Sequence, residues 1–252
     1  MTGKIKNSLA APADEELCEL FDGRLKLFQK RQGYRFSVDS ILLGDFIRER
    51  AAGRVIDLGT GSGILAVLLS RIAAVREIVG IEVQDNLAAL AQKNIAHNEC
   101  ADRVTIIRAD VRELKKTFLA GSFDAVISNP PFYPIKSGLL NLDSGKAVSR
   151  HELHGTLADF MQIASYLLKR AGPFLTIYPC FRIGDLVEEM RAVKLEPKTL
   201  CFIHPNIKEP ANLVLVEGIK GGGKEARILP PLVLFGADGS YSEQARALFQ
   251  RV

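Results

Sequence analysis

The chain has 252 residues, of which 47% are hydrophobic and 25% are charged, with 33 basic and 29 acidic side chains. These proportions are close to the globular average, so they exclude a disordered or fibrous chain. The net charge of +4 permits an anionic partner but excludes an interaction driven by bulk positive charge alone.

Residues 1–50 are expected to form an N-terminal extension that packs on the core. Residues 1–13 are small, polar and aperiodic. Apolar residues from Leu17 to Phe36 indicate short strands around two turns, at Asp22-Gly23 and Gln32-Gly33. A helix with a mostly apolar stripe is predicted from Ser37 to Arg50.

Residues 51–220 alternate apolar strands with amphipathic helices, which predicts a core domain. Strands are predicted at 54–58, 77–82, 103–109, 123–128, 174–178, 199–203 and 213–216, and helices at 64–73, 85–98, 157–169 and 183–193. This alternation predicts an α/β fold with a mostly parallel, seven-stranded sheet and helices on both faces. The last two strands have no helix between them, so we expect them to form an antiparallel edge pair.

Residues 221–252 are expected to be a tail that completes the same domain. The tail has an apolar patch at 230–235 and a short helix from Tyr241. The segment Gly218–Lys224 has the G-x-x-x-x-G-K spacing of a phosphate-binding loop, but Glu225 stands where Ser or Thr is required and no helix follows. We therefore expect a flexible connector there.

The four cysteines show neither zinc-binding nor redox-motif spacing, and we expect free thiols in a reducing compartment. No apolar run reaches the roughly 18 residues that a membrane span needs. Residues 1–13 lack the apolar segment of a secretory signal. The sequence therefore predicts a cytoplasmic protein with no membrane contact and no metal site.

A glycine-rich turn, Asp57-Leu58-Gly59-Thr60-Gly61-Ser62-Gly63, follows the first core strand and opens a helix. Glycines permit a tight turn and the close approach of a ligand to the backbone. In an open α/β sheet, ligands bind at the carboxyl ends of the strands, where this turn lies. The candidate cofactor-binding residues here are Asp57, Gly59, Thr60, Gly61 and Gly63. A tight turn alone would also need glycines, so this motif by itself is weak.

Acids end three successive strands, at Asp57, Glu82 and Asp110. Glu82 follows Gly63 by 19 residues (82 − 63), where a carboxylate can accept hydrogen bonds from a ribose. Asp110 is placed to accept a hydrogen bond from an adenine amino group. Acids at strand ends also cap the following helices, so capping is the alternative interpretation.

The fourth core strand ends in Asn129-Pro130-Pro131-Phe132. Two prolines stiffen the chain and remove two amide donors. The Asn129 side-chain carbonyl and the Pro130 carbonyl can accept both hydrogens of a planar NH2 group, which localises the nitrogen lone pair. Phe132 offers a face on which a planar base stacks. These four residues are the candidate catalytic group.

These motifs together resemble the Rossmann-like class I methyltransferases that use S-adenosyl-L-methionine to methylate exocyclic or amide nitrogens, from Gly53 to about Lys220. Segments outside that core extend the resemblance to the bacterial tRNA1(Val) adenine-N6 methyltransferases, which act on adenine-37 beside the anticodon. Those segments are Gly33–Asp39 with Leu42-Leu43, then Ser149–Glu152, then Pro231–Phe235 followed by Asp238–Tyr241. One departure is Phe132, where many relatives have tyrosine.

The resemblance implies S-adenosyl-L-methionine as cofactor, held by the turn together with Glu82, Asp110 and Val111, and the anticodon loop of a tRNA as partner. Other substrates of the same motif stay open: guanine N2 in ribosomal RNA, adenine N6 in DNA, and a release-factor glutamine amide. A non-catalytic module that binds the cofactor or RNA is a further alternative, although such a module has no use for amine acceptors. The sequence leaves the oligomeric state open between monomer and homodimer.

Two groups of residues are candidates for substrate contact. Lys30, Arg31, Tyr34 and Arg35 belong to a stretch of basic residues and aromatics that could follow an RNA backbone and stack on bases. A solvated hairpin edge is the alternative, and the 34–39 segment could instead close over the methyl donor. Arg150 and His151 follow the catalytic strand and either touch substrate or begin a helix. His151 and His154 are three residues apart, which does not fit the zinc motif H-E-x-x-H.

Overall fold

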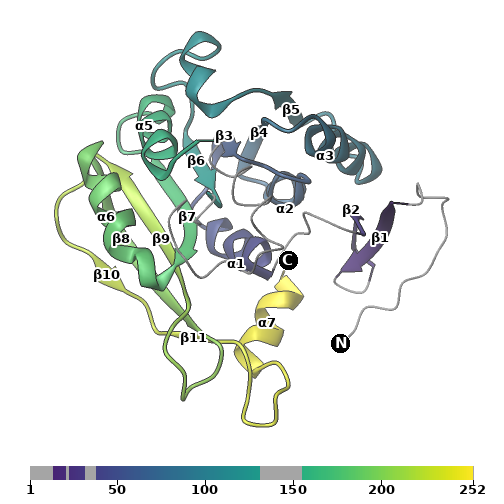
Figure 1. The fold of residues 1–252 in the computed structure, drawn as a ribbon, viewed down its shortest axis with the longest axis vertical. Helices are drawn as coiled ribbons and strands as arrows, with labels where there is room; N and C mark the ends of the chain where they lie inside the picture. The colour runs from purple at the N-terminus through teal and green to yellow at the C-terminus, as the bar shows by residue number, and fades with distance from the viewer. Residues whose placement is uncertain (1–13, 21–22, 32–37, 131–154, 252) are drawn as a thin grey trace, which may run out of the picture.

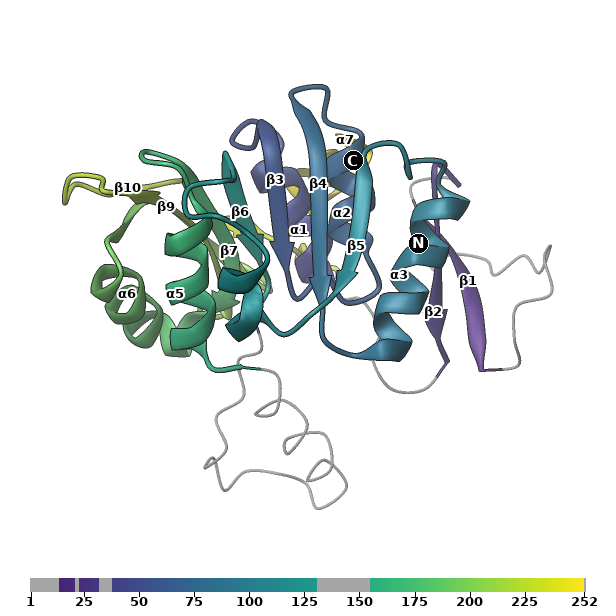
Figure 2. The same cartoon turned by 90° about the horizontal axis from the view of Figure 1, so that it is seen from above.

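A computed structural model describes residues 14–20, 23–31, 38–130 and 155–251. In Figure 1 a twisted sheet runs through the middle of the molecule, and a small N-terminal hairpin lies beside it. Figure 2 shows helices on both faces of the sheet, as the alternation of apolar strands and helices predicts.

The main sheet has the strand order β10-β8-β9-β7-β6-β3-β4-β5, with β11 also paired to β8. Five neighbouring strands run parallel, and β9 runs antiparallel to both β7 and β8. The expected mostly parallel sheet with an antiparallel edge pair is therefore confirmed. The principal strands are β3 (Gly53–Leu58), β4 (Val75–Glu82), β5 (Val104–Arg108), β6 (Ala125–Ser128), β7 (Pro173–Pro179), β8 (Leu195–His204) and β9 (Leu213–Lys220).

Successive residues of each strand point to opposite faces of the sheet, which creates two separate cores. On β3, Val55 joins one core and Ile56 the other. The first core is covered by α1 (Val38–Ile47), α2 (Ile64–Ser70), α3 (Asp85–His97) and α7 (Glu243–Arg251); the second is covered by α5 (Leu157–Leu167) and α6 (Ile183–Ala192).

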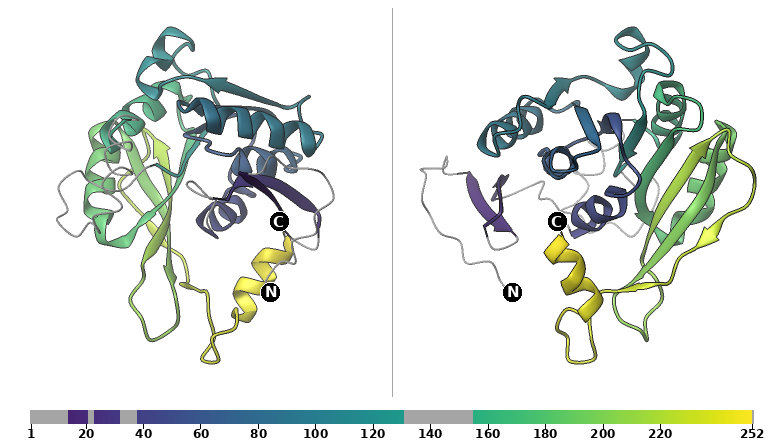
Figure 3. Two further views of the ribbon diagram at one scale, coloured as in Figure 1. Left: turned by 45° about the vertical axis from the view of Figure 1, so that its right-hand side comes forward. Right: turned by 180° about the vertical axis from the view of Figure 1, so that it is seen from behind.

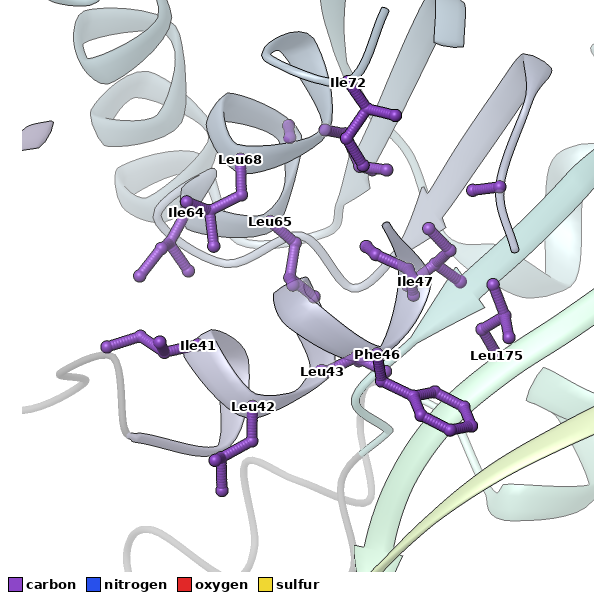
Figure 4. Packing of buried hydrophobic residues seen from close by; sticks show 14 of the residues in the cluster. Ile41, Leu42, Leu43, Phe46, Ile47, Ile64, Leu65, Leu68, Ile72 and Leu175 are labelled. Atoms are coloured by element: carbon purple, nitrogen blue, oxygen red, sulfur yellow. The ribbon is translucent and has the colours of Figure 1, made fainter. Parts of the chain in front are cut away.

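Helix α1 packs between α2 and β7 (Figure 4). Its Leu42, Leu43 and Ile47 side chains are completely buried. Residues of α1 and the start of α2 share the first core. The glycine-rich turn therefore leads directly into a buried apolar contact between these two helices.

The N-terminal hairpin consists of β1 (Glu15–Leu20) and β2 (Leu25–Lys30), paired antiparallel around Gly23. It is separate from the main sheet, and β2 lies against α3 (Figure 3). Gly23 has a φ of 81°, which fits the turn predicted at Asp22-Gly23. The second predicted turn, at Gln32-Gly33, lies outside the described residues.

The tail adds elements that the periodicity did not predict. Two-residue strands β10 (Arg227–Ile228) and β11 (Leu232–Val233) pair parallel with β8, so the sheet has nine strands within the described residues instead of seven. A strand of two residues is too short to show an alternation of apolar and polar residues, so the sequence pattern does not reveal it. The apolar patch at 230–235 places Leu232 and Leu234 in the first core. The predicted connector is partly wrong, because Gly218–Lys220 continue β9. Gly221–Lys224 then lead from β9 toward β10, and no helix directly follows them.

Candidate functional site

The glycine-rich turn leaves the end of β3 and leads into α2. Gly59, Gly61 and Gly63 have φ values of 75°, 58° and 82°, in the left-handed region that favours glycine. The amides of Gly59 and Thr60 donate to the Ile81 carbonyl at 2.9 and 2.8 Å. The turn is thus folded against the carboxyl end of β4, and its conformation depends on the three glycines.

Asp57 lies completely buried at the centre of this site, in register with Gly80 on β4 and Ile127 on β6. Neither carboxylate oxygen makes a well-formed hydrogen bond to any described residue. Burial raises the pKa of Asp57 to about 7; the nearby Thr60 hydroxyl opposes part of this rise, and the charge of Glu82 adds to it. A buried carboxylate whose oxygens can still accept hydrogen bonds suits a ligand that brings hydrogen-bond donors or positive charge.

Glu82, the last residue of β4, is 5% exposed and reaches back to the glycine-rich turn. Its Oε2 accepts from the Gly61 amide at 3.0 Å, and its Oε1 accepts from the Gln84 amide at 2.9 Å. Each oxygen keeps capacity for a further donor, because a carboxylate has about four acceptor positions. Glu82 therefore shapes the turn and can still bind hydroxyl groups of a ligand.

Asp110 lies after β5 and caps the short 3-10 helix Val111–Lys116. Its Oδ1 accepts from the Arg112 amide at 2.9 Å and from the Arg112 Nε at 2.9 Å. The capping interpretation considered for strand-end acids is therefore observed here, and any ligand would share this carboxylate with Arg112. Val111 is 4% exposed and belongs to the second core, beside the Gly155 backbone.

Asn129 and Pro130 follow β6, the strand next to β3. Ser128 pairs in register with Leu58, and its Oγ donates to the Leu58 carbonyl at 2.8 Å. Asn129 directly follows Ser128, and Gly59 directly follows Leu58, so both residues leave the same edge of the sheet from neighbouring strands. Asn129 is half-buried and Pro130 is buried. The topology therefore brings the candidate amine acceptors and the candidate cofactor turn to neighbouring positions on the same sheet edge.

The basic residues of the hairpin are largely engaged by acids of its own opposite strand. Lys30 Nζ lies 2.7 Å from Asp14 Oδ2 and 3.0 Å from Glu15 Oε1, and these partners raise its pKa. Lys26 pairs with Glu19 at 3.2 Å. Arg31 is exposed, and its Nε donates to the Glu15 carbonyl. Lys30 is therefore committed within the hairpin, which favours the solvated-edge alternative for it.

Several candidates from the sequence lie outside the described residues. These are Tyr34, Arg35, Pro131, Phe132, Arg150 and His151. Among the residues that the structure does describe, no three His, Cys, Asp or Glu side chains are grouped so as to hold a metal ion. The same residues contain no helix with the length and apolarity that crossing a bilayer requires.

Two residues that shape the site were not singled out from the sequence. A Cβ at Gly80 would lie 3.1 Å from the Thr60 side chain and 2.7 Å from Ile106, so glycine makes room there for the turn. Asn94 on α3 is completely buried and bonds both the turn and the hairpin. The available signal in the sequence was an asparagine on the apolar face of an amphipathic helix, four residues after Leu90 and three after Ala91.

Known proteins resemble this chain over most of its length. A family model described as a methyltransferase small domain matches residues 35–142. A tRNA1(Val) (adenine(37)-N6)-methyltransferase from Tolumonas auensis is 30% identical over 189 residues, which are 75% of this chain and 77% of the relative. A protein of the same name from Photobacterium profundum is 28% identical over 218 residues, 86% of this chain and 90% of the relative.

Solved structures share the fold at lower identity. A predicted O-methyltransferase from Agrobacterium tumefaciens superposes with a TM-score of 0.67 and 20% identity, covering 84% of this chain and 95% of that one. TYW2 from M. jannaschii, solved in complex with AdoMet, gives 0.56 and 14%, covering 84% and 89%. The fold is thus that of class I methyltransferases.

Proposed function

The chain belongs to the tRNA1(Val) (adenine(37)-N6)-methyltransferase family, and we propose that it transfers a methyl group from S-adenosyl-L-methionine to N6 of adenine-37 in that tRNA. The observation that carries the proposal is the position of Asn129, which follows β6 at the same sheet edge where the glycine-rich turn follows β3, one strand away from the buried Asp57. This arrangement puts acceptors for a planar amine beside a turn built to hold a ligand.

The residues of the turn fit the methyl donor. Asp57 is buried with unsatisfied oxygens, and the hydroxyl oxygens of Thr60 and Ser62 are likewise buried without a well-formed bond to a described residue. A polar ligand with a cationic amino group would satisfy such groups. We assign the donor's methionine portion to this turn and its ribose to Glu82. Asp110 and Val111 are assigned to the donor's adenine.

When bound, S-adenosyl-L-methionine supplies a methyl group on a positively charged sulfur. Asn129 and the Pro130 carbonyl accept the two N6 hydrogens of the target adenine, so that the N6 lone pair faces the methyl group. The stiff Asn-Pro segment keeps these acceptors in place with little entropy left to lose. Positioning of this kind accounts for much of the catalytic effect. The N6–carbon bond forms as the carbon–sulfur bond breaks, and S-adenosylhomocysteine leaves. No strong base is required, because N6 becomes acidic as the new bond forms and water can take its proton.

The four-residue motif continues through Pro131 and Phe132, and we assign Phe132 to stacking on the target base. Because an adenine in the anticodon loop must leave the base stack to reach such a pocket, a stacking face compensates part of the unstacking cost, by about 1–3 kcal/mol. Among the hairpin residues, Arg31 is retained as a candidate RNA contact, together with Tyr34, Arg35, Arg150 and His151.

The direct test incubates the purified protein with methyl-labelled S-adenosyl-L-methionine and tRNA1(Val) that lacks the modification, then digests the RNA and identifies the labelled nucleoside. We expect N6-methyladenosine, and no label in a tRNA with guanine at position 37. Label in a release factor instead of RNA would support an amine-methylating site and would contradict tRNA as the substrate. Donor binding without transfer to either acceptor would favour the non-catalytic module.

A further inference from the structure

Asn94 has an unusual position for an amide side chain in the middle of a helix. It lies on α3 with no exposed surface and makes three hydrogen bonds. Its Oδ1 accepts from the Phe28 amide at 2.7 Å, and its Nδ2 donates to the Phe28 carbonyl at 3.0 Å and to the Ser62 carbonyl at 2.9 Å. Both Nδ2 hydrogens and one oxygen lone pair are thus used by the protein itself.

The two partners belong to segments that lie far apart in the sequence. Phe28 is in β2 of the N-terminal hairpin, 66 residues before Asn94, whereas Ser62 stands between Gly61 and Gly63 in the turn. The Asn94 side-chain amide bonds both the N–H and the C=O of Phe28, as the backbone of a neighbouring strand would. Both left-handed glycines beside Ser62 make the turn intrinsically adaptable, so a bond to the Ser62 carbonyl restricts its conformation.

Neighbouring residues hold the hairpin against the same face of α3. Lys93 Nζ lies 2.7 Å from Glu15 Oε2 and 3.7 Å from the centre of the Phe28 ring. Asn98, one helical turn beyond Asn94, donates to the Lys26 carbonyl at 2.8 Å. Lys93 and Asn98 bond the hairpin, and the Asn98 amide also donates to the Asn94 carbonyl at 2.8 Å; among the described residues neither side chain bonds the turn. Asn94 alone of the three bonds both segments.

We propose that Asn94 is a positioning residue, which holds the glycine-rich turn in its donor-binding conformation and couples donor binding to the docking of the N-terminal hairpin. This inference rests on the proposed function, because it takes the turn to be the donor site. The coupling is reciprocal: a donor that orders the turn fixes Asn94, and a fixed Asn94 holds the Phe28 backbone more firmly.

The first test needs no variant. Hydrogen exchange of the full chain is measured with and without S-adenosylhomocysteine. We expect the Phe28 amide to exchange at least about fivefold more slowly when the ligand is bound, although the ligand binds at the turn. An unchanged Phe28 rate, with slower exchange in the turn itself, would overturn the coupling.

The second test compares Asn94→Ala with the matched control Asn98→Ala. Loss of the Ser62 bond should weaken S-adenosyl-L-methionine binding about tenfold or more, as expected for a buried carbonyl left without its donor. Asn94→Ala should raise the KM for the donor, and its kcat at saturating donor should fall less than about threefold. The control removes one hairpin bond but keeps the bonds from Asn94 to Phe28 and Ser62, so donor affinity should stay within about twofold.

The outcomes separate the two proposals. If the wild-type protein binds no S-adenosyl-L-methionine by calorimetry, the proposed function fails and Asn94 has nothing to position. If the wild type binds and both variants bind equally well, the proposed function stands and the role of Asn94 is wrong. Where Asn94→Ala does not fold, Asn94→Asp replaces it: the aspartate can still accept from the Phe28 amide but cannot donate to the Ser62 carbonyl.

Discussion

The Glu82 carboxylate accepts a hydrogen bond from the Gly61 backbone amide at 3.0 Å, although Glu82 ends β4 and Gly61 follows β3. The bond joins the end of β4 to the middle of the glycine-rich turn. It gives Glu82 a structural task in addition to the ribose contact proposed for it. Loss of this carboxylate therefore affects the turn even before a ligand is considered.

Glu82→Ala should weaken donor binding at least tenfold. The variant removes both the acceptor proposed for the ribose and the bond to Gly61, and hydrogen bonds to a charged group are each worth about 1.5–3 kcal/mol. Isothermal calorimetry with S-adenosylhomocysteine measures the effect. Glu82→Gln keeps one acceptor oxygen and should lose less; an unchanged affinity in the alanine variant would place the donor elsewhere.

Asp57→Asn should stabilise the ligand-free protein more at pH 8 than at pH 5. With a folded-state pKa of about 7 against an ordinary 3.8, the folded protein retains a proton that the unfolded chain releases. Stability therefore falls as pH rises from about 4 to 7, by an amount on the order of 4 kcal/mol in total, and the neutral asparagine removes this cost. Urea unfolding at both pH values measures the difference.

Asp124→Asn is the matched control, because the fold favours the charged form of Asp124, whereas it disfavours the charged form of Asp57. The Arg54 amide and Lys169 lower the pKa of Asp124, so its contribution is present above about pH 4 and is lost as pH falls below that value. The substitution should destabilise the protein at pH 8 as well as at pH 5. Equal gains for Asp57→Asn at pH 5 and pH 8 would contradict the raised pKa.

Asn129→Ala should reduce turnover about a hundredfold or more and leave donor affinity within about twofold. The side chain is proposed to orient the amine in the transition state, whereas the donor is proposed to bind at the turn. Single-turnover methylation gives the first quantity and calorimetry the second. Asn129→Asp, which retains an acceptor oxygen, should lose less activity. A turnover equal to that of the wild type would remove the amine-acceptor role.

Lys30→Gln and Arg31→Gln should differ in their effect on tRNA binding. Lys30 is paired with Asp14 and Glu15, so its loss should lower thermal stability and leave the salt dependence of binding unchanged. Arg31 is exposed and is proposed to contact RNA, so its loss should reduce the slope of log affinity against log salt by about 1. A reduced slope for Lys30→Gln alone would show that its ion pairs open on RNA binding.

The sequence by itself determined the order of the core elements and the edge of the sheet where the site forms. Alternating periods of two and of 3.6 residues identify strands and helices locally, and in a parallel sheet every strand's carboxyl end lies at one edge. The positions of Asp57, Glu82 and Asn129 at strand ends follow from this rule. The pairing of Asp110 with Arg112 is also local, since only two positions separate the two residues.

Only the tertiary structure decided how these groups are engaged. Lys30 pairs with Asp14 and Glu15, although the stretch of basic residues around it in the sequence contains no acid. Asn94 bonds Phe28, 66 residues away in the sequence, and Ser62, 32 residues away. The buried state of Asp57 depends on the packing of α1 and α2 over β3, and the tail strand β11 depends on a free edge of β8. Such relationships depend on distance in space, whereas a sequence pattern reports only on residues within a few turns of one another.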